Sequence, residues 1–397
     1  MVEKGFKKTE IGLIPEDWEV KNIISFAKII TGGTPPTNDK SNYGDEYFFV
    51  SPSDLGNGRI IQFTEKKLSK KGFNISRKFP KDSVLFTCIG STIGKLGIAD
   101  RELTSNQQIN AVLPNDSFNS VYLYYILFLN TNKIKQIAGQ TALPIINKTQ
   151  FGELSIPLPP KPEQEAIAKV LSDTDTLIEK LEQLIAKKRL IKQGAMQQLL
   201  KPKKGWEVKK LGEVAVIEKG EQLNRQTLSE KDTYPVFNGG ITPSGYTDKW
   251  NTEKDTIIIS EGGNSCGFVN FIKERFWRGG HCYQVVSKIK KMFLFYLLKS
   301  FEREIMSLRV GSGLPNIQRN RLLSFEIPIP KDKSEQTRIA QILTDMDNEI
   351  EALERQLAKY IQIKQGMMQV LLTGKIRLVK PVKARHTLSH QHVEKNG

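Results

Sequence analysis

A stretch of sequence that occurs twice constrains the fold of this chain more than any other feature. The first copy spans residues 156–200 and the second spans residues 327–372. From Glu163 and Glu335 onward the copies align without a gap, and about half of the aligned positions are identical. Each copy opens on a proline-rich segment, and proline cannot extend a strand or the interior of a helix. A new element therefore begins in the same way at two places in the chain.

Apolar residues in each copy recur at alternating intervals of four and three positions. This is the heptad spacing of a coiled-coil seam, and so narrow an apolar stripe needs a partner to bury it. We therefore expect the two copies to pack together as one two-helix coiled coil. The first copy contributes the seam residues Ile167, Leu171, Ile178, Leu181 and Ile185, with Thr174 and Lys188 at the remaining seam positions. The second copy contributes Ile339, Leu343, Met346, Ile350, Leu353, Leu357 and Tyr360.

The repeat also includes the start of two globular regions. The sequence Trp-Glu-Val-Lys at residues 18–21 returns unchanged at residues 206–209. The predicted order is therefore globule, helix, globule, helix, and a chain of 397 residues is long enough for two or three domains. We place a first globular domain at 1–155, a central helix at 156–203, a second globular domain at 204–326, a C-terminal helix at 327–374 and a basic, disordered tail at 375–397.

Both globular regions have the pattern of an α/β protein of mixed α+β type, with short strand-like runs and glycine-rich turns. A clear strand-like run lies at residues 47–50, and core helices are predicted at residues 121–137 and 291–308. The middles of the regions differ, because segment 41–60 has no clear twin in segment 231–250. A protein that keeps its frame and varies its loops usually varies what it binds.

The composition points to a polyanionic partner. Lysine and arginine outnumber aspartate and glutamate by 59 to 43, which gives a formal net charge of +16 and suggests nucleic acid. A basic but unspecialised soluble protein is the alternative that charge alone leaves open. The three cysteines are too few for a disulfide framework, the N-terminal residues have no apolar core for export, and no apolar run reaches the length of a membrane span. We therefore expect a cytoplasmic protein with no membrane partner.

The motifs of common enzyme classes are missing. The glycine-rich segment 88–97 follows a strand-like run at 83–88, but its spacing is wrong for a phosphate loop, and Lys95 is not followed by the Ser or Thr that binds magnesium. A turn between strands is the favoured interpretation. The nucleophile elbow, the zinc-protease helix and the adenine-gripping segment of amino-methyltransferases are also absent from the sequence. We therefore expect no catalytic site on this chain.

Metal binding is likewise disfavoured. Cys266 and Cys282, with the neighbouring His281, lack the paired spacing and the fourth ligand of a zinc site. Three further histidines lie in the basic tail, where solvated side chains are favoured over a metal site: His386, His390 and His392.

Polar side chains suited to reading DNA are concentrated in the predicted loops. Asn and Gln pair with adenine edges, Arg and Lys with guanine, and Ser and Thr with bases or phosphates, although any one of them can be an ordinary turn residue. The candidates in the first globular region are Thr31, Gly32, Gly33, Thr34, Ser51, Ser53, Ser91, Thr92, Lys95, Asn106, Gln107 and Gln108. Those in the second are Gln222, Asn224, Arg225, Asn238, Gly239, Gly240, Asn264, Ser265, His281, Tyr283, Gln318 and Arg319.

With these motifs in view, the chain resembles the specificity subunit of type I restriction-modification systems. The resemblance covers residues 18–372. It is carried by the two proline-rich helix starts with Glu-Gln, the paired Ile-Lys-Gln-Gly segments, the Thr-Gly-Gly-Thr-Pro loop at 31–35 and the Gly-Ser-Thr-Ile-Gly-Lys segment at 90–95. The loop at 31–35 has no good copy at 219–223, so its role is not transferred there.

The resemblance implies two target-recognition domains that alternate with two helical regions paired antiparallel. It implies that each domain reads one half of a split target on double-stranded DNA. It further implies binding to two methyltransferase subunits for adenine methylation and, through them, to two motor-nuclease subunits for restriction. No cofactor is then expected on this chain, since S-adenosylmethionine belongs to the methyltransferase, and ATP and magnesium belong to the motor-nuclease.

An antiparallel coil would relate the two globular regions by a pseudo-twofold axis, which matches the antiparallel strands of a duplex. A helix of this length would act as a ruler that sets the unread spacer between the half-sites. Three alternatives stay open: a self-sufficient nucleic-acid enzyme, a coiled-coil scaffold that binds only proteins, and a specificity subunit of a fused system of another type.

Overall fold

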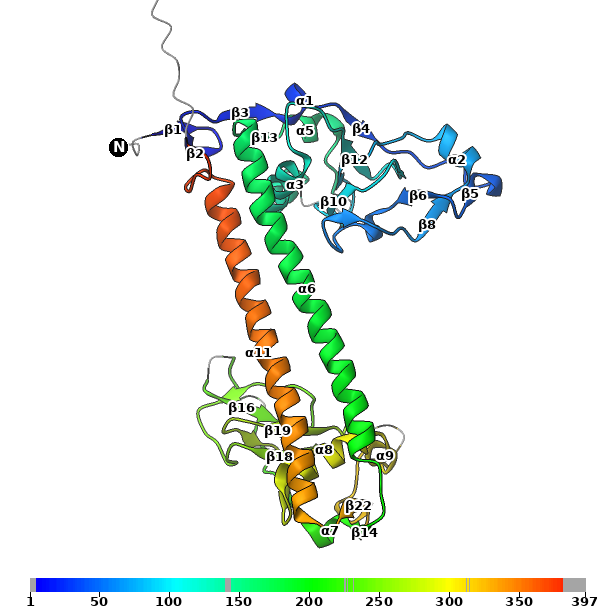
Figure 1. Ribbon diagram of the computed structural model, residues 1–397, viewed down its shortest axis with the longest axis vertical. Coiled ribbons are helices and arrows are strands. Elements are labelled where there is room, and N and C mark those ends of the chain that lie inside the picture. The colour runs from blue at the N-terminus through cyan, green and yellow to red at the C-terminus, as the bar shows by residue number, and fades with distance from the viewer. Residues whose placement is uncertain are drawn as a thin grey trace, which may run out of the picture. The chain divides into compact units, whose positions relative to one another are not determined.

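The structure is a computed structural model, and it describes residues 5–139, 144–224, 226, 228–230, 232–311, 313 and 315–380. The chain divides into two compact units (Figure 1). The first unit consists of residues 1–180 and 358–397, and the second consists of residues 181–357. The first unit is thus built from the two ends of the sequence and the second from its middle.

Two long helices of 39 residues each, α6 (Lys161–Leu199) and α11 (Lys333–Leu371), contribute to both units. Each helix begins beside a buried glutamine that is common to both repeats. The side-chain amides of Gln164 and Gln336 donate to the carbonyl of a preceding proline, at 2.8 and 3.0 Å. Because a buried amide without a partner is costly, these bonds fix where each helix leaves the strand before it.

Ion pairs show that the two long helices pack antiparallel. In the first unit Lys364 Nζ on α11 lies 2.5 Å from Asp175 Oδ1 on α6. In the second unit Arg189 Nη2 on α6 lies 2.6 Å from Glu354 Oε1 on α11. Higher residue numbers on α6 therefore meet lower numbers on α11, which confirms the predicted two-helix coiled coil.

The predicted seam residues lie on the covered faces of the two helices. The buried ones are Ile167, Leu171, Leu181, Ile185, Ile339, Leu343 and Ile350, and the half-buried ones are Ile178, Met346, Leu353, Leu357 and Tyr360. The seam also merges with the globular cores. Ile167 and Leu171 at the start of α6 pack with Met368 and Leu371 at the end of α11 in the core of the first unit.

Two sheets form the globular region of the first unit, with strand orders β4-β12-β9-β10-β7 and β11-β6-β8-β5. The five-stranded sheet consists of β4 (Ile29–Thr31), β7 (Ile60–Ile61), β9 (Val84–Thr87), β10 (Leu96–Ala99) and β12 (Ile109–Val112). The four-stranded sheet consists of β5 (Tyr43–Gly44), β6 (Tyr47–Val50), β8 (Lys66–Leu68) and β11 (Thr104–Ser105). Two further pairs are β1 (Phe6–Thr9) with β2 (Gly12–Pro15), and β3 (Glu19–Asn22) with β13 (Ser155–Leu158). The helices are α1 (Ile23–Phe26), η1 (Lys40–Asn42), η2 (Pro52–Asp54), α2 (Lys70–Ile75), α3 (Ser120–Leu129), α4 (Thr131–Ile137) and α5 (Lys148–Gly152).

The second unit repeats this arrangement with fewer strands, in the orders β15-β21-β18-β19 and β17-β16-β20. Its sheets consist of β15 (Ala215–Lys219), β16 (Tyr234–Phe237), β17 (Tyr246–Thr247), β18 (Thr256–Ser260), β19 (Val269–Ile272), β20 (Trp277–Arg278) and β21 (Cys282–Ser287). The pair β14 (Trp206–Lys210) with β22 (Glu326–Pro330) corresponds to β3 with β13 in the first unit. The helices are α7 (Leu211–Val214), α8 (Lys291–Ser300), α9 (Glu302–Ser307) and α10 (Arg319–Leu323).

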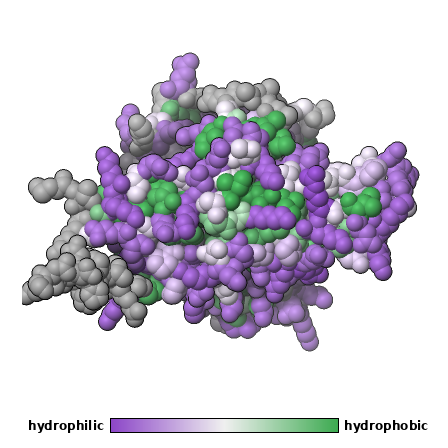
Figure 2. Space-filling view, turned by 90° about the horizontal axis from the view of Figure 1, so that it is seen from above, coloured by the Kyte–Doolittle hydropathy of each residue, from purple (hydrophilic) through white to green (hydrophobic). Residues whose placement is uncertain are grey.

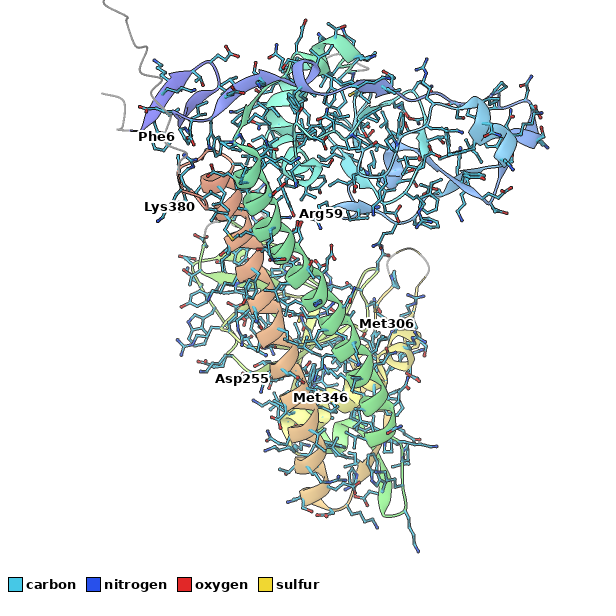
Figure 3. All side chains as sticks on the ribbon, turned by 45° about the horizontal axis from the view of Figure 1, so that its top comes forward. Phe6, Arg59, Asp255, Met306, Met346 and Lys380 are labelled. Atoms are coloured by element: carbon cyan, nitrogen blue, oxygen red, sulfur yellow. The ribbon has the colours of Figure 1, made fainter. Side chains whose placement is uncertain are left out.

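A clasp of three side chains fixes the first globular region to both long helices. The Tyr125 hydroxyl on α3 donates to Asp175 Oδ2 on α6 at 2.5 Å, and Lys364 of α11 pairs with the other carboxylate oxygen. Burial and then the hydrogen bond to Asp175 raise the pKa of Tyr125, so its hydroxyl stays protonated and donates. Arg59, labelled in Figure 3, reaches the Ser172 hydroxyl on α6 and adds a second tie.

The same clasp recurs in the second unit. The Tyr296 hydroxyl on α8 donates to Asp347 Oδ2 on α11 at 2.7 Å, and Lys192 of α6 pairs with the other oxygen of that carboxylate. Each clasp therefore joins the core helix of a globular region to both helices of the coil.

Two sequence predictions for the globular regions are corrected by the structure. The single core helix predicted over 121–137 is two helices, α3 and α4, because the Asn130 side chain donates to the Ile126 carbonyl and the backbone leaves the helical path there. The predicted helix over 291–308 is likewise broken at Phe301, between α8 and α9.

The second correction concerns the middles of the globular regions, which the sequence treats as unrelated. Strand β6 pairs in parallel with β11, and strand β16 pairs in parallel with β20. The next backbone step is also shared, since Asn106 N donates to Val50 O at 3.0 Å and Gly279 N donates to Phe237 O at 2.8 Å. The two-residue partner strands are too short to align by sequence, although they hold the same place in each fold.

Arg377 joins the C-terminal segment to the first globular region. Its guanidinium makes two hydrogen bonds to Asp17 at 2.8 Å and two to Glu163 at 2.5 and 2.6 Å. Trp18 Nε1 also donates to Glu163, at 3.0 Å. The predicted disorder of the tail therefore does not hold for residues 375–380, because the carboxylates bind Arg377. Residues 381–397, with the three tail histidines, lie outside the described residues.

Hydrophilic side chains cover most of the face seen in Figure 2, with separate hydrophobic patches between them. Among the described helices, none is both long enough and apolar enough to cross a membrane.

Candidate nucleic-acid interface

The predicted DNA-reading residues of the first unit follow strand ends that meet at one edge of the five-stranded sheet. Strand β4 ends at Thr31 opposite Asn110, and strand β9 ends at Thr87 opposite Ile109, the first residue of β12. Since β12 is antiparallel to both neighbours, its start lies beside their ends. Loop 32–34, turn 88–95 and loop 106–108 therefore come to the same edge.

The four-stranded sheet brings further candidates to this edge. Strand β6 ends at Val50, so Ser51 follows directly, and Ser51 lies 2.9 Å from Ser53 through their hydroxyls. Across the loops, the Thr34 hydroxyl donates to Gln107 Oε1 at 2.7 Å. Asn106 and Gln108 are joined by their side chains at 3.1 Å.

Gly32 is required for this close approach of loops. Its N–H donates to Ile109 O at 3.0 Å, and the N–H of Gly33 donates to Ser105 O at 2.8 Å. A Cβ atom on Gly32 would lie 2.2 Å from the Asn106 carbonyl oxygen, a distance that no side chain tolerates. Gly32 is therefore needed for the packing of these loops, and this need does not depend on any contact with DNA.

The glycine-rich segment 88–97 is a tight turn between β9 and β10, as the sequence predicts. Gly90 and Gly94 have φ values of 85° and 91°, in the left-handed region that glycine adopts easily. Ser91 is exposed at the tip of the turn, and Thr92 and Lys95 are half-buried.

The second unit forms an equivalent edge. Strand β15 ends at Lys219 opposite Tyr283, strand β18 ends at Ser260 opposite Cys282, and β16 ends at Phe237. The loops after these strands carry Gln222 and Asn224, Asn238 to Gly240, Asn264 and Ser265, and the turn before β21 carries His281.

Gly220 is the counterpart of Gly32, which the comparison of the two loop sequences misses. Its N–H donates to Cys282 O at 3.0 Å, and the N–H of Glu221 donates to Arg278 O at 3.0 Å. A Cβ atom on Gly220 would lie 2.2 Å from the Gly279 carbonyl oxygen. The two loops therefore share one backbone constraint, although only the glycine is common to both.

Backbone hydrogen bonds also match positions whose side chains differ. In the first unit Cys88 N donates to Gln108 O at 2.8 Å, and Cys88 O accepts from Ile146 N. In the second unit Glu261 N donates to His281 O at 2.9 Å, and Glu261 O accepts from Ile317 N. Glu261 therefore takes the place of Cys88, and His281 takes the place of Gln108.

Several candidates of the second unit hold the loops together. Asn238 Oδ1 accepts from His281 N at 3.1 Å, and the Gly239 carbonyl accepts from the hydroxyls of Ser260 and Ser265. Asn224 Oδ1 accepts from Gln226 N at 3.1 Å.

The remaining candidates lie around the start of α10. Gln318 precedes that helix, and Arg319 Nε donates to Ile217 O at 2.8 Å. Tyr283 is buried, and its hydroxyl donates to Glu261 Oε1 at 2.8 Å. Burial and then this hydrogen bond raise the pKa of Tyr283. Arg225 lies outside the described residues.

Two charged residues at the edge escape the sequence analysis. The Lys219 ammonium lies 2.7 Å from Glu261 Oε1, and the Glu261 side chain is only 12% exposed. Their position is the signal that marks them, since Lys219 is the last residue of β15 and Glu261 directly follows the last residue of β18. On the first edge Asn110 is also missed. It bonds to Thr31 through Oδ1, at 2.6 Å, and to Cys88 Sγ.

The cysteines do not have the character of metal ligands. All three are buried, and burial raises the pKa of Cys88 and of Cys282 to about 12, so their thiols are neutral. Within the described ranges of the chain, no cluster of three metal-binding side chains occurs.

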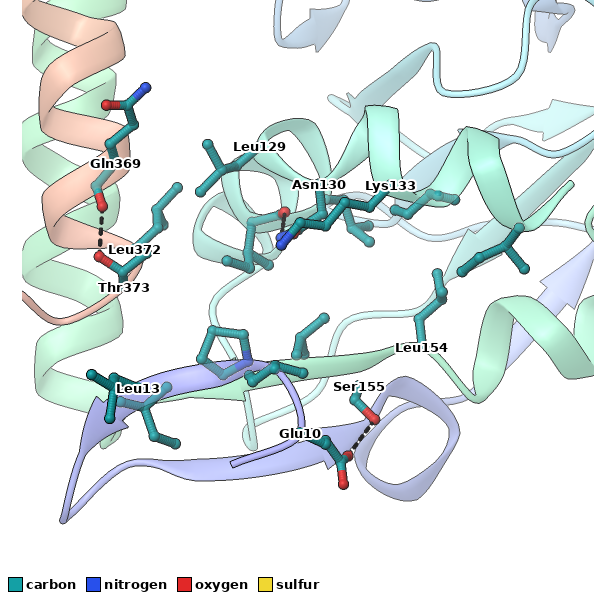
Figure 4. A pocket seen from close by; sticks show the side chains of 18 of the residues that line it. Glu10, Leu13, Leu129, Asn130, Lys133, Leu154, Ser155, Gln369, Leu372 and Thr373 are labelled. Atoms are coloured by element: carbon teal, nitrogen blue, oxygen red, sulfur yellow. Dashed lines mark hydrogen bonds between the residues drawn. The ribbon is translucent and has the colours of Figure 1, made fainter. Parts of the chain in front are cut away.

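A cavity of about 690 Å³ lies elsewhere in the first unit, lined by β2, α3, α4, β13 and the end of α11 (Figure 4). Leu129, Leu154 and Leu372 give it a largely apolar wall, and Lys133 lies at its side. It holds none of the predicted DNA-reading residues.

Comparison with known proteins gives one consistent result. A family model described as the type I restriction modification DNA specificity domain matches the chain twice, over residues 15–187 and 203–363. The specificity subunit of the type I restriction enzyme MjaVIII from Methanocaldococcus jannaschii is 29% identical over 418 residues, which cover 95% of this chain and 97% of the relative. The MjaIX specificity subunit of the same organism is 28% identical over 427 residues, with the same coverage of both chains.

A solved structure shares the fold. The S subunit of a type I restriction-modification system from M. genitalium matches with a TM-score of 0.66 at 21% identity, over 89% of this chain and 96% of that chain.

Proposed function

Because the chain belongs to the type I restriction modification DNA specificity family, we propose that each of its globular regions reads one half of a split DNA target. The chain is a specificity subunit with two target-recognition domains, and it is a non-catalytic component of a restriction-modification complex. It binds DNA and assembles with other subunits.

One observation carries the proposal: the two units present equivalent loop edges with different side chains. The glycines Gly32 and Gly220 hold the same backbone bonds, whereas Cys88 and Gln108 are replaced by Glu261 and His281. A shared frame with divergent side chains is what reading two different sequences requires. The predicted DNA-reading residues at both edges stay candidates for direct contact.

For assembly, we assign two methyltransferase subunits to the repeated Ile-Lys-Gln-Gly segments of α6 and α11. Ile191 and Ile363 begin these segments and are 46% and 39% exposed. Exposed apolar residues in a repeated motif mark an interaction surface. Two motor-nuclease subunits then join through the methyltransferases. The boundaries 1–155, 156–203, 204–326 and 327–374 are the domain limits that we propose for this division of roles.

The paired helices set the length of the unread spacer in this proposal. Inserting four residues after Glu182 and four after Glu354 adds about 6 Å to both helices. The spacer preferred by the complex is then expected to lengthen by about one or two base pairs, with both half-sites unchanged. An unchanged spacer in a folded, active complex would contradict the proposal that helix length sets spacer length.

The decisive experiment is to co-express this chain with its methyltransferase and to map methylated bases in the host DNA. Adenine methylation at a split motif with a fixed spacer is expected. Methylation at a continuous motif would support DNA recognition but contradict the proposal that the paired helices set a spacer. If a demonstrated complex methylates nothing and shows no salt-dependent DNA binding, a protein-binding scaffold becomes the better description.

A further inference from the structure

We propose that Lys219 and His281, positioned by Glu261, form a guanine-reading site at the edge of the second unit. This inference rests on the proposed function, in which the second globular region reads one half of the target. Within that half-site, Lys219 and His281 select a guanine, and Glu261 holds the two side chains in place.

The geometry places one buried carboxylate beneath two exposed donors. Lys219 Nζ lies 2.7 Å from Glu261 Oε1, and His281 Nδ1 lies 3.5 Å from Glu261 Oε2. The side chain of Glu261 is 12% exposed, whereas those of Lys219 and His281 are 53% and 61% exposed. The Tyr283 hydroxyl holds Oε1 from the core side at 2.8 Å.

The three residues stand on rigid elements. Lys219 ends β15, Glu261 follows the last residue of β18, and His281 directly precedes β21, so they lie at the ends of three adjacent strands. The backbone bond from Glu261 N to His281 O, at 2.9 Å, fixes the last two relative to each other. Sites on strand ends hold their donors more precisely than sites on long loops.

The chemistry of the two donors fits the edge of guanine. In the major groove guanine presents two acceptors, O6 and N7, whereas adenine and cytosine present amino groups, which are donors. The Lys219 ammonium and an imidazole N–H of His281 can each donate to guanine. An amino group in the same place would meet a donor and lose a hydrogen bond.

The site reads a base and not a phosphate for two reasons. Glu261 offsets the charge of Lys219 and would repel a phosphate. The equivalent positions in the first unit are neutral, with Thr31 for Lys219 and Cys88 for Glu261. Phosphates are alike in both halves of a target, whereas base edges differ, so divergence at equivalent positions fits base recognition.

The test measures binding of the full chain, assembled with its methyltransferase, to duplexes in which each base pair of the mapped target is varied in turn. The wild type is expected to prefer guanine at one position of the second half-site. Lys219→Thr, which copies the first unit, is expected to reduce that preference about tenfold and to leave the first half-site unchanged. His281→Gln is expected to weaken the same position, and Lys219→Arg to retain the preference.

The positioning role of Glu261 has its own readout. Glu261→Gln is expected to lower the guanine preference, and adding Glu261→Gln to Lys219→Thr is expected to lower it no further, because both changes break one unit. The matched control is Lys254→Thr, an exposed lysine just before β18, at the opposite end of that strand. It is expected to change no base preference.

Three outcomes overturn the inference while the proposed function stands. The first is a second half-site without a G·C pair. The second is a Lys219→Thr or His281→Gln variant with unchanged base preferences. The third is a variant that loses affinity equally for all sequences, with a salt slope reduced by about one, which marks a phosphate contact. A wild type without any split-target preference would instead refute the proposed function. The melting temperature of each variant verifies that it is folded. Since the His281 side chain is exposed, His281→Gln tests the site even if a change at the buried Glu261 disturbs the core.

Discussion

The two units are attached to the coil in the same way, and they differ in the side chains of their loop edges. The clasp is identical in chemistry, with Tyr125 and Asp175 in the first unit and Tyr296 and Asp347 in the second, each closed by a lysine of the other helix. At the loop edge, a neutral Cys88 stands where the second unit has Glu261. The frame is therefore kept while the loop edges vary.

Substitution of the glycines at the loop edges is expected to destabilise the protein most. Gly32→Val and Gly220→Val each place side-chain atoms against a backbone carbonyl that would lie 2.2 Å from Cβ. We expect each to lower the free energy of unfolding by about 3 kcal/mol, measured by urea denaturation of the full chain. Each variant is expected to lose recognition of its own half-site first. Gly33→Val, where a Cβ meets no atom within 4 Å, is the control for Gly32. An equal loss of stability for Gly33→Val would show that the steric clash at Gly32 is not the cause.

The clasp gives the next largest effect, and it should be the same in both units. Asp175→Ala and Asp347→Ala each remove the acceptor of a tyrosine hydroxyl and the partner of a half-buried lysine. We expect each to cost about 2.5 kcal/mol in the same measurement. Asp173→Ala, two residues earlier on α6 and with an exposed carboxylate, should cost much less. Unequal losses for Asp175 and Asp347 would show that the clasp is not equivalent in the two units.

The repeated tryptophans differ between the units, because within the described residues only Trp18 has a hydrogen bond from its ring nitrogen. Trp18 Nε1 donates to Glu163 at 3.0 Å, whereas Trp206 Nε1 is buried and has no acceptor within the described structure. Trp18→Phe is therefore expected to cost about 1.5 kcal/mol more than Trp206→Phe. Both changes remove the same ring atoms, and the difference in unfolding free energy reports on the hydrogen bond together with the deeper burial of Trp18, since Trp206 is half-buried. Equal costs would mean that the Glu163 contact contributes nothing.

The smallest effect concerns the buried thiols. Burial raises the pKa of Cys88 and Cys282 to about 12 in the folded protein, against an ordinary value of 9.0. Above pH 9 the unfolded chain therefore binds fewer protons than the folded one, and stability falls as pH rises from 9 towards 12. At pH 8 we expect no alkylation of either thiol by iodoacetamide in the native protein, and full alkylation after denaturation. Rapid native labelling would show that these strands open locally.

The coil and the alternation of regions could be predicted from the sequence because their signal is local and repeated. The heptad seam from Ile167 to Ile185 needs only spacing, and the shared Trp-Glu-Val-Lys marks the start of each globule. The helix break at Asn130 could not be predicted, because the side-chain bond that ends α3 competes with a pattern that continues across it.

The candidate site could be predicted in part. Polar loop residues such as Thr34 and Gln107 are recognisable by type, and the structure brings them together. The match of Gly220 with Gly32 and of Glu261 with Cys88 depends on hydrogen bonds between strands far apart in sequence, which single residues do not reveal. A charged residue at a strand end is the sequence signal for Glu261. This signal points to a site only when the contacts of Glu261 with Lys219 and Tyr283 are known.

The contact made by Arg377 has a consequence for the order in which the units can form during synthesis. The second unit is one continuous segment, residues 181–357, and all of it precedes residue 358 in the chain. The first unit needs the later residues, because the Glu163 side chain is only 2% exposed and gains its guanidinium partner from Arg377. An unpaired buried carboxylate is costly, so the first unit reaches its full stability only after the ribosome has made Arg377. The region that is translated first is thus the last to be completed.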